Sequence, residues 1–466
     1  MIPLIELCLY FVLSAFLLAK AFQRPIWALG YYMLNYFAQP QYWAWGTPLP
    51  AGMRWSLIAA YVMLVSVLMF GTEREFRSDP DEKRTSLFAI FLVLNGLFVH
   101  FVFAYYPEGS WPIFVEMTKF VVLYFVIVRL IQSRQDFILM IWFLVLGVAY
   151  WGGAARFWGT LIIDRGRLEH FGGPGCDQSN ELASIMVCLL PVIIGFLAML
   201  KGRQRLFVIA SALLGLNIVM MCQSRGGFIS LIAVLSVVPL VASGRARKVA
   251  IQGLAVSLLA VVLLAGNPEI AARFLMIFTS EDEVGDTNVE RIAYASKESR
   301  KKFWKVGMDI VADYPFGSGG DTFKYERGQG YQGREGLPYR NQSVHQGFIN
   351  EALDWGIQGL LIHLGFVFSS MWCVVKTMRF RKRLGDFSAS FFGPCLLGGF
   401  AGFLVGCLVG DFFYLEWGYW LCIISVCYAK IFGEVNYGLL PDVMISGEQA
   451  AEGDPELYRE LVASRV

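Results

Sequence analysis

Long apolar runs alternate with polar connections along most of this 466-residue chain. Most runs approach the roughly 20 residues that an α-helix needs to cross the hydrocarbon core of a bilayer. The pattern predicts an all-α polytopic membrane protein. Candidate spans lie at about 2–19, 26–39, 55–71, 87–105, 113–131, 136–152, 180–200, 205–222, 226–242, 248–266, 348–375, 389–410 and 413–432. The second is short for a full crossing, so we expect twelve or thirteen transmembrane helices.

Composition supports this class of protein. Hydrophobic residues make up 56% of the chain and charged residues 16%, whereas soluble proteins carry about 25% charge. A net charge of +2 gives no reason to expect a nucleic-acid partner. The nine cysteines lack paired spacing, so neither a disulfide framework nor a zinc site is predicted.

Lys and Arg are unevenly divided between the two sets of alternate connections. One set holds 19 of them and the opposite set five, with the longest connection left aside. Because Lys and Arg are enriched in cytoplasmic loops, the first set is predicted to be cytoplasmic. The tail after about residue 433 falls on that side, and its residues 455–462 read as a short amphipathic helix.

The longest connection then faces outward and divides the chain. We expect an N-terminal transmembrane bundle (1–266), a large outward loop (267–347), C-terminal transmembrane helices (348–432) and a cytoplasmic tail (433–466). Within the loop, residues 288–312 have helical spacing, with Arg300, Trp304 and Met308 on one face, before a turn-rich segment at 314–320. Loops of this length are usually functional.

Two arginines on the outward side are candidates for binding an anion. Arg225 stands between two apolar runs, before Gly226 and Gly227, where a ligand can approach the backbone and a helix N-terminus favours negative charge. Arg300 lies among lysines of the loop helix, and its fork of donors suits phosphate. The alternatives are an interfacial arginine reaching lipid headgroups and a solvated basic helix face.

His345 is the candidate base, because it stands where the large loop returns to the membrane. A histidine near its reference pKa can accept a proton from a hydroxyl at neutral pH. The alternative is an inert loop histidine. His100 and His363 lie in apolar runs and are predicted to be hydrogen-bonded core residues.

Other polar residues lie at the ends of apolar runs. Asn180 and Glu181 open one run, where they cap a helix or, for Glu181, form a buried carboxylate. Asp79-Pro80-Asp81 reads as an exposed cytoplasmic turn. The outward connections contain no Asp-x-Asp pair, so neither a divalent metal nor a cofactor is predicted.

The segment that closes the large loop resembles a signature of the O-antigen ligase and polymerase superfamily. In that signature a histidine is followed about eleven residues later by one glycine and three later by another, as with His345, Gly356 and Gly359. This chain departs from the usual pattern at two positions, Gln346 and Asp354, which we expect to affect the fit of the acceptor.

Three earlier segments carry the same resemblance over roughly residues 170–375. The family's arginine-bearing helix and Gly-x-Gly turn match Arg300, Trp304, Pro315, Gly317 and Gly319. Its Ser-Arg-Gly element matches residues 224–227, and its polar helix opening matches residues 178–183. The N-terminal half is also similar to O-glycosylation ligases associated with exosortase clusters.

The resemblance implies a GT-C-like glycosyltransferase in the bacterial inner membrane, with its active site facing the periplasm. Such an enzyme moves a glycan from undecaprenyl diphosphate to a hydroxyl of a glycan, lipid or protein acceptor. The resemblance assigns the catalytic roles to Arg225, Arg300 and His345. The residues expected to bind substrate are Gln178, Asn180, Glu181, Gly226, Trp304, Tyr339 and Arg340.

Elementary chemistry is consistent with those roles. Two arginines can stabilise the charge that grows on a diphosphate leaving group, in place of a metal. His345 can take the acceptor proton, and direct attack would invert the anomeric carbon. Aromatic loop residues either stack on sugars or pack within the loop; they are Trp304, Tyr325, Tyr331 and Tyr339.

Three other functions are alternatives to a ligase. A polysaccharide polymerase would share donor, fold and residues with a ligase. A transporter or flippase of lipid-linked glycans would need no chemistry, and a scaffold would leave the clustered Arg and His residues unexplained.

Overall fold

The computed structural model of the chain describes residues 2–50, 52–70, 79–157, 162–164, 167–253, 288–337 and 343–434. Within these residues, seven helices are long and apolar enough to cross a membrane, and two shorter apolar helices accompany them. The prediction of a helical polytopic membrane protein is therefore confirmed. The count of twelve or thirteen spans stays a prediction.

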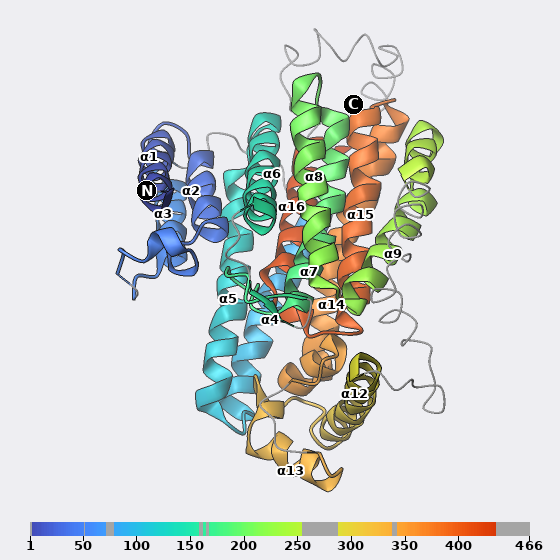
Figure 1. Cartoon of the computed structure of the whole chain (residues 1–466). Coiled ribbons are helices and arrows are strands. Elements are labelled where there is room, and N and C mark those ends of the chain that lie inside the picture. Colours follow the sequence, from blue (N-terminus) through green and yellow to red (C-terminus); the bar gives the residue numbers. More distant parts are fainter. Residues whose placement is uncertain are drawn as a thin grey trace.

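The helices that overlap the predicted spans stand side by side in one bundle (Figure 1). They coincide with the predicted spans: α1 (Ile2–Ala21), α2 (Ile26–Phe37), α3 (Trp55–Phe70), α4 (Pro80–Val102), α5 (Pro107–Leu130), α6 (Arg134–Phe157), α7 (Ser179–Phe196), α8 (Arg203–Cys222), α9 (Arg225–Val241), α14 (Gly347–Arg383), α15 (Phe387–Cys407) and α16 (Glu416–Phe432). A single apolar core runs through most of the bundle.

Several predictions lie wholly or partly outside the described residues. They are the tail helix at 455–462, the span at 248–266 beyond residue 253, the loop at 267–287, and the site residues Tyr339 and Arg340.

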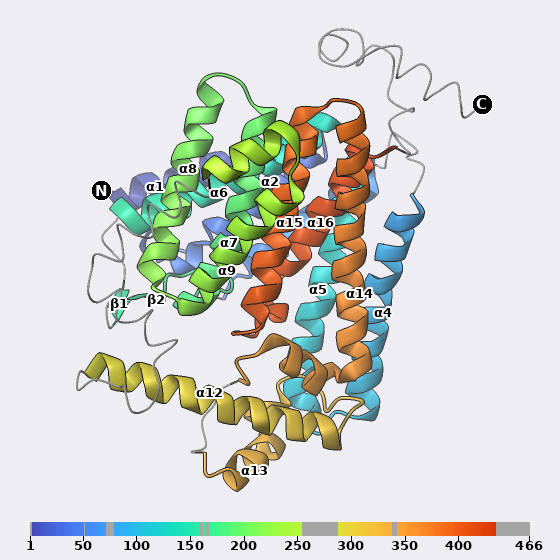
Figure 2. The same ribbon diagram turned by 90° about the vertical axis from the view of Figure 1, so that its right-hand side faces the viewer.

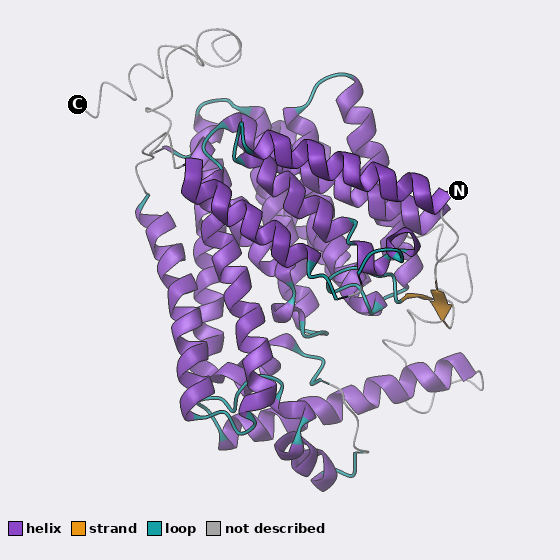
Figure 3. Ribbon diagram, turned by 90° about the vertical axis from the view of Figure 1, so that its left-hand side faces the viewer, coloured by secondary structure: helices purple, strands orange, loops and turns teal. Residues whose placement is uncertain are grey.

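Four connections meet at one end of the bundle, which we call the site face. They are the antiparallel hairpin of β1 (Ile162–Asp164) and β2 (Arg167–Glu169), the α8–α9 connection, the large loop before α14, and the α15–α16 connection. Figure 3 shows the hairpin and the large loop's long helix at the same end of the molecule.

The large loop contributes α12 (Asn288–Asp313), the short helix η5 (Thr322–Lys324) and α13 (Glu326–Arg334). The helix predicted at 288–312 is thus confirmed, and it lies across the end of the bundle (Figure 2). Its apolar face forms a small second core with the end of the loop and the start of α14: Phe303, Val306, Ile310, Phe323, Leu337, Val344 and Leu353. Met308, predicted on the face of Arg300 and Trp304, is 55% exposed.

The predicted span at 348–375 is interrupted. Gly356 in α14 has φ 82° and ψ 165°, which no helix contains, so α14 consists of two helical segments joined at this residue. The first segment belongs to the site face and the second enters the bundle (Figure 2).

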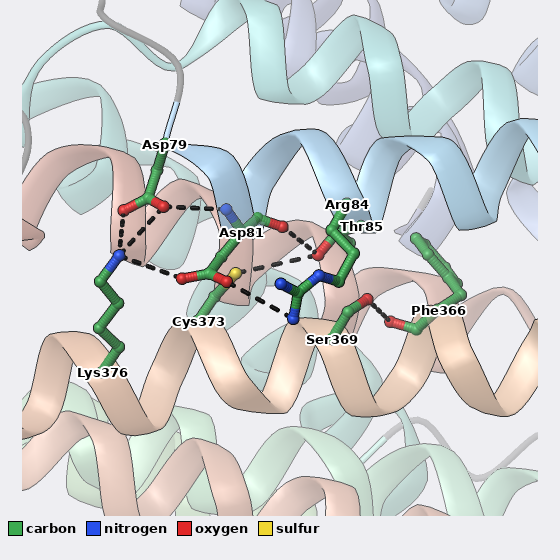
Figure 4. Close-up of polar contacts among 8 residues, drawn as sticks. All are labelled: Asp79, Asp81, Arg84, Thr85, Phe366, Ser369, Cys373 and Lys376. Carbon is green, nitrogen blue, oxygen red and sulfur yellow. Dashed lines mark hydrogen bonds and ion pairs between the residues drawn. The ribbon is translucent and has the colours of Figure 1, made fainter.

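Asp79 and Asp81 do not form the exposed turn expected from their sequence. The Asp79 carboxylate accepts the Asp81 N–H at 2.9 Å and caps α4. Lys376 of α14 donates to Asp79 at 2.8 Å and to Asp81 at 3.0 Å (Figure 4). The three side chains join α4 to α14 at the end of the bundle opposite the site face, because α14 starts at that face and runs away from it.

Glycines of α15 allow close packing against α7 and α9. A Cβ at Gly402 would lie 2.8 Å from side-chain atoms of both Val187 and Val234. Small residues at four-residue spacing, here Gly398, Gly402 and Gly406, are typical of tightly packed transmembrane helices.

Gly402→Val is expected to separate α15 from α7 and α9, and so to lower the thermal unfolding midpoint of the detergent-purified protein by several degrees. The physical reason is overpacking, which typically costs about 1–3 kcal/mol. Gly153→Val is the matched control, because a Cβ at this helical glycine meets nothing within 4 Å. Equal midpoints for the two variants would contradict the packing described here.

Candidate active site

Arg225 is positioned by the cap of α9. Ser224 has an extended backbone, and its Oγ accepts the Gly227 N–H at 3.2 Å, so the helix begins at Arg225. A Cβ at Gly226 would lie 2.8 Å from Val409, and one at Gly227 would lie 2.8 Å from Ala183. The two glycines therefore let the start of α9 pack against α7 and the α15–α16 connection, in addition to any role with a ligand.

The side-chain oxygen of Asn180 connects α7 to β2 and to the α8–α9 connection. That oxygen accepts from Arg167 at 2.9 Å and from the Ser224 hydroxyl at 2.8 Å. Arg167 also donates to the Cys222 carbonyl at 3.1 Å. Asn180 thus fixes the α8–α9 turn, and with it Arg225, against β2 and α7.

The first turn of α7 is capped by the hairpin. Glu169 accepts from the Ser179 N–H at 2.9 Å and from its hydroxyl at 2.7 Å. A carboxylate at a helix N-terminus is favoured by the helix dipole. Asn180 and Glu181, the residues expected to cap this helix, therefore do not supply the cap; Glu181 is half-buried in the same turn and Gln178 is exposed.

Arg300 lies close enough to the other two arginines for their charges to act on it. Burial lowers its pKa first, and the charges of Arg225 and Arg167 lower it further, while Asp411 opposes them. Arginine stays protonated in spite of such shifts. Three guanidinium groups from α9, β2 and α12 thus share one region of the site face, which favours an anionic ligand there.

His345 is held at the start of α14 by Asp411. The Asp411 carboxylate accepts the backbone N–H groups of His345 at 3.0 Å and Gln346 at 2.9 Å. The His345 Nδ1 lies 4.0 Å from Asp411 Oδ2 and 3.4 Å from the Ser343 hydroxyl. Its backbone is left-handed, with φ 58°, a conformation that these contacts hold in place.

Burial favours the neutral form of the His345 imidazole. Burial lowers the pKa of His345 below 6.5, Asp411 raises it, and Arg300 and Lys324 lower it. Burial also raises the pKa of Asp411. The His345 side chain keeps 27% of its surface exposed, so a neutral imidazole remains within reach of a ligand.

Gly317, Gly319 and Gly356, which belong to the motifs found in the sequence, lie together in a structural joint. In the turn at 315–319, Gly317 has φ 96° and Gly319 has φ 90°. Backbone hydrogen bonds connect this turn to the interruption of α14: Ser318 donates to Leu353, Gly319 to Asp354 and Ile357 to Pro315. The joint fixes the loop, and so Arg300, relative to His345.

Gly317→Val is expected to open this joint. A Cβ there would lie 2.6 Å from the Gly356 nitrogen and 2.9 Å from the Asp354 carbonyl, and the left-handed backbone alone costs a β-branched residue about 1–2 kcal/mol. We expect faster hydrogen exchange over residues 300–320, measured by mass spectrometry. Gly330→Ala, where a Cβ meets nothing within 4 Å, should leave exchange unchanged. Unchanged exchange in Gly317→Val would show that the joint does not hold the loop.

Two buried histidines are confirmed as hydrogen-bonded core residues. His363 Nδ1 lies 2.8 Å from Glu351, and His100 Nδ1 lies 3.2 Å from Ser110.

Among the aromatic loop residues, the described ones pack within the protein. Tyr325 lies 4.3 Å from the Tyr106 ring, and the Tyr331 hydroxyl donates to Asp313. Trp304 is half-buried against the small second core.

Asp411, Arg167, Lys324 and Ser343 were missed as site residues by sequence reasoning. Asp411 could have been found from the sequence, because it is an acid in a predicted outward connection between two apolar runs. No local pattern marked Arg167 or Lys324, because each becomes relevant only through contacts that the fold creates.

Fold and site together define a helical membrane protein with a cluster of arginines and a histidine on one face. Residues 210–364 match the family model described as O-Antigen ligase, about a third of the chain. The matched segment contains Arg225, Arg300 and His345, and it confirms the resemblance to the O-antigen ligase superfamily. No curated protein matches the chain.

Proposed function

We propose that this protein transfers a glycan from a polyprenyl-diphosphate donor to an acceptor hydroxyl, at a site facing the periplasm of a bacterial inner membrane. The family match supports the coarser statement, a membrane glycan ligase- or polymerase-like role. The observation that supports the finer proposal is that the start of α9 with Arg225, α12 with Arg300 and the start of α14 beside His345 all lie at the site face.

The arginines bind the diphosphate in this proposal. The leaving group gains negative charge as the glycosidic bond breaks, and preorganised guanidinium groups stabilise that charge more strongly in a partly desolvated site than in water. Arg225 and Arg300 are the direct ligands. Arg167 is a positioning residue, because its side chain already donates to Asn180 and Cys222.

His345 acts as the base. Its Nδ1 is near Ser343 and Asp411, so we assign the role to Nε2. The acceptor oxygen forms a bond to the anomeric carbon, the bond from that carbon to the diphosphate oxygen breaks, and the electron pair leaves with the diphosphate. The acceptor proton moves to Nε2, and the Asp411 carboxylate stabilises the resulting imidazolium. One direct displacement inverts the anomeric carbon.

Complementation of a deletion strain tests this function in the cell. The deletion should abolish one glycoconjugate, detected by gel mobility and mass spectrometry, and wild-type protein should restore it. Arg225→Lys, which keeps the charge but removes the fork, should not restore it at equal membrane abundance. Whether the lost product is a capped acceptor or a long polymer separates a ligase from a polymerase. Full restoration by Arg225→Lys would count against a bidentate role.

A further inference from the structure

A cavity of about 1020 Å³ lies beside the candidate active site. Its walls come from α2, α3, α5 and α16, and residues of the connections at 39–42 and 174–175 also line it. Four of its lining residues are among the large exposed hydrophobics: Tyr42, Tyr61, Trp111 and Val122. The cavity is therefore accessible from outside the bundle beside α3 and α5.

The end of the cavity that lies in the large loop and at η6, which we call the inner end, is lined by residues near His345. Lys324, whose charge acts on His345, lines the cavity and pairs with Asp321 at 2.7 Å. The short helix η6 (Phe412–Tyr414), which begins next to Asp411, contributes Phe413 and Tyr414 to the lining. The Tyr414 hydroxyl donates to Asp354 at the interruption of α14.

The arginines belong to other elements. They stand on β2, α9 and α12, and none of the three lines the cavity. The charges acting on Arg300 include Arg225 and Arg167, whereas those acting on His345 include Arg300 and Lys324. Asp411, which accepts the His345 backbone N–H at 3.0 Å, directly precedes the cavity-lining residues of η6, so His345 lies near the cavity as well as near Arg300.

The charge of the cavity differs from that of the arginine cluster. The charged residues that line it are Arg54, Glu116, Lys119, Asp321, Lys324, Glu351 and Glu416, four acids and three bases. Such a lining does not favour a diphosphate. Glu116 and Lys119 pair at 2.7 Å on α5 with about half of each side chain exposed, so the cavity offers polar groups as well as aromatic walls. Charges on a membrane helix usually face a polar cavity or substrate path.

We propose that this cavity holds the acceptor, an amphiphile with an apolar chain between α3 and α5 and a neutral, hydroxyl-bearing head beside Lys324 and Tyr414. Donor and acceptor then approach His345 from opposite sides, the diphosphate on the arginines and the hydroxyl from the cavity. Aromatic walls suit a sugar head, because rings pack against the apolar faces of sugars and still offer polar edges. This inference rests on the proposed glycan transfer.

Two substitutions on α3 form a matched pair for the test. Ala60 lines the cavity, and Ala60→Trp fills part of it. Ile58, two residues away on the same helix, is 39% exposed and does not line the cavity, so Ile58→Trp is the control. Leu64→Trp, one turn from Ala60 on the lining face, is the second variant if Ala60→Trp fails to fold. Folding is checked by size-exclusion elution and thermal midpoint.

The first readout is binding without turnover. A dodecyl glucoside with a diazirine in its alkyl chain is photo-crosslinked to the purified full-length protein, and labelled peptides are mapped by mass spectrometry. We expect labelling of α3 and α5 that falls at least fivefold in Ala60→Trp and not in Ile58→Trp. No preferential labelling of these helices, or equal labelling in both variants, would overturn the inference. This readout needs no catalysis. If the wild-type protein were labelled as expected but transferred no glycan, the proposed function would be wrong and the proposed binding cavity would still stand.

The second readout separates acceptor from donor. With a synthetic polyprenyl-diphosphate glycan as donor and the dodecyl glucoside as acceptor, Ala60→Trp should raise the acceptor KM at least tenfold and leave the donor KM within twofold. A raised donor KM with an unchanged acceptor KM would assign the cavity to the donor's lipid chain and overturn the inference. Ile58→Trp should match wild type in both constants.

Discussion

Arg300→Ala is expected to lower the rate of glycan transfer by about 10²–10³-fold, the usual effect of removing one charge-stabilising donor from an active site. Arg300 is half-buried, and its charge lies near those of Arg225 and Arg167, with Asp411 as the acid that acts on it. Glu169 lies 3.7 Å from Arg167, and a diphosphate bound here would place its negative charge beside Arg300 and Arg225. Most of the loss should appear in kcat, because charge on the leaving group grows in the transition state.

Lys302→Ala is the matched control for this prediction. Lys302 lies two residues away on α12, but it is exposed. Its loss should leave the transfer rate within about twofold of wild type, as is usual for a substitution away from the site. If Arg300→Ala and Lys302→Ala transferred glycan at the same rate, the basic character of α12 would be a property of its surface, and Arg300 would have no role in the reaction.

His345→Ala is expected to lower kcat by about 10²–10⁴-fold, the range for loss of a general base. The neutral imidazole is the active form, so wild-type activity should fall as pH drops through the His345 pKa, which lies below 6.5. The acidic limb of a kcat/KM profile reports this pKa in the free enzyme.

Substitution of two charged residues near His345 should shift the acidic limb of the kcat/KM profile in opposite directions. Lys324 lowers the pKa of His345, so Lys324→Met should move the limb to higher pH. Asp411 raises the pKa of His345, so Asp411→Asn should move the limb to lower pH and also reduce kcat, because the imidazolium loses its stabilising carboxylate. A limb that stays fixed in both variants would mean that another group sets the pH dependence.

Local patterns in the chain were sufficient to predict several features of the fold. The spans that fall within the described residues, the loop helix at 288–312 and the helix start at Arg225 follow from short-range periodicity and capping signals, and the structure has each of them. The three catalytic candidates also came from segments that can be interpreted alone. The separate segments could not predict how close the three side chains lie to one another in the fold.

The features that sequence reasoning missed depend on contacts between distant residues. Asp411 acts on His345, 66 residues earlier in the chain. Asp79 seemed exposed because its partner Lys376 is 297 residues away. The interruption of α14 at Gly356 is stabilised by a turn about 40 residues earlier, so periodicity alone favoured an uninterrupted span.

Formation of a glycosidic bond distinguishes the proposed enzyme from a transporter of lipid-linked glycans. The most direct test mixes the detergent-purified protein with a synthetic polyprenyl-diphosphate glycan and an acceptor, without vesicles, and follows product by mass spectrometry and anomeric configuration by NMR. We expect a glycosylated acceptor with an inverted anomeric carbon and one polyprenyl diphosphate released per transfer. No product here, combined with movement of the intact donor across the bilayer of reconstituted vesicles, would contradict it and favour a transporter.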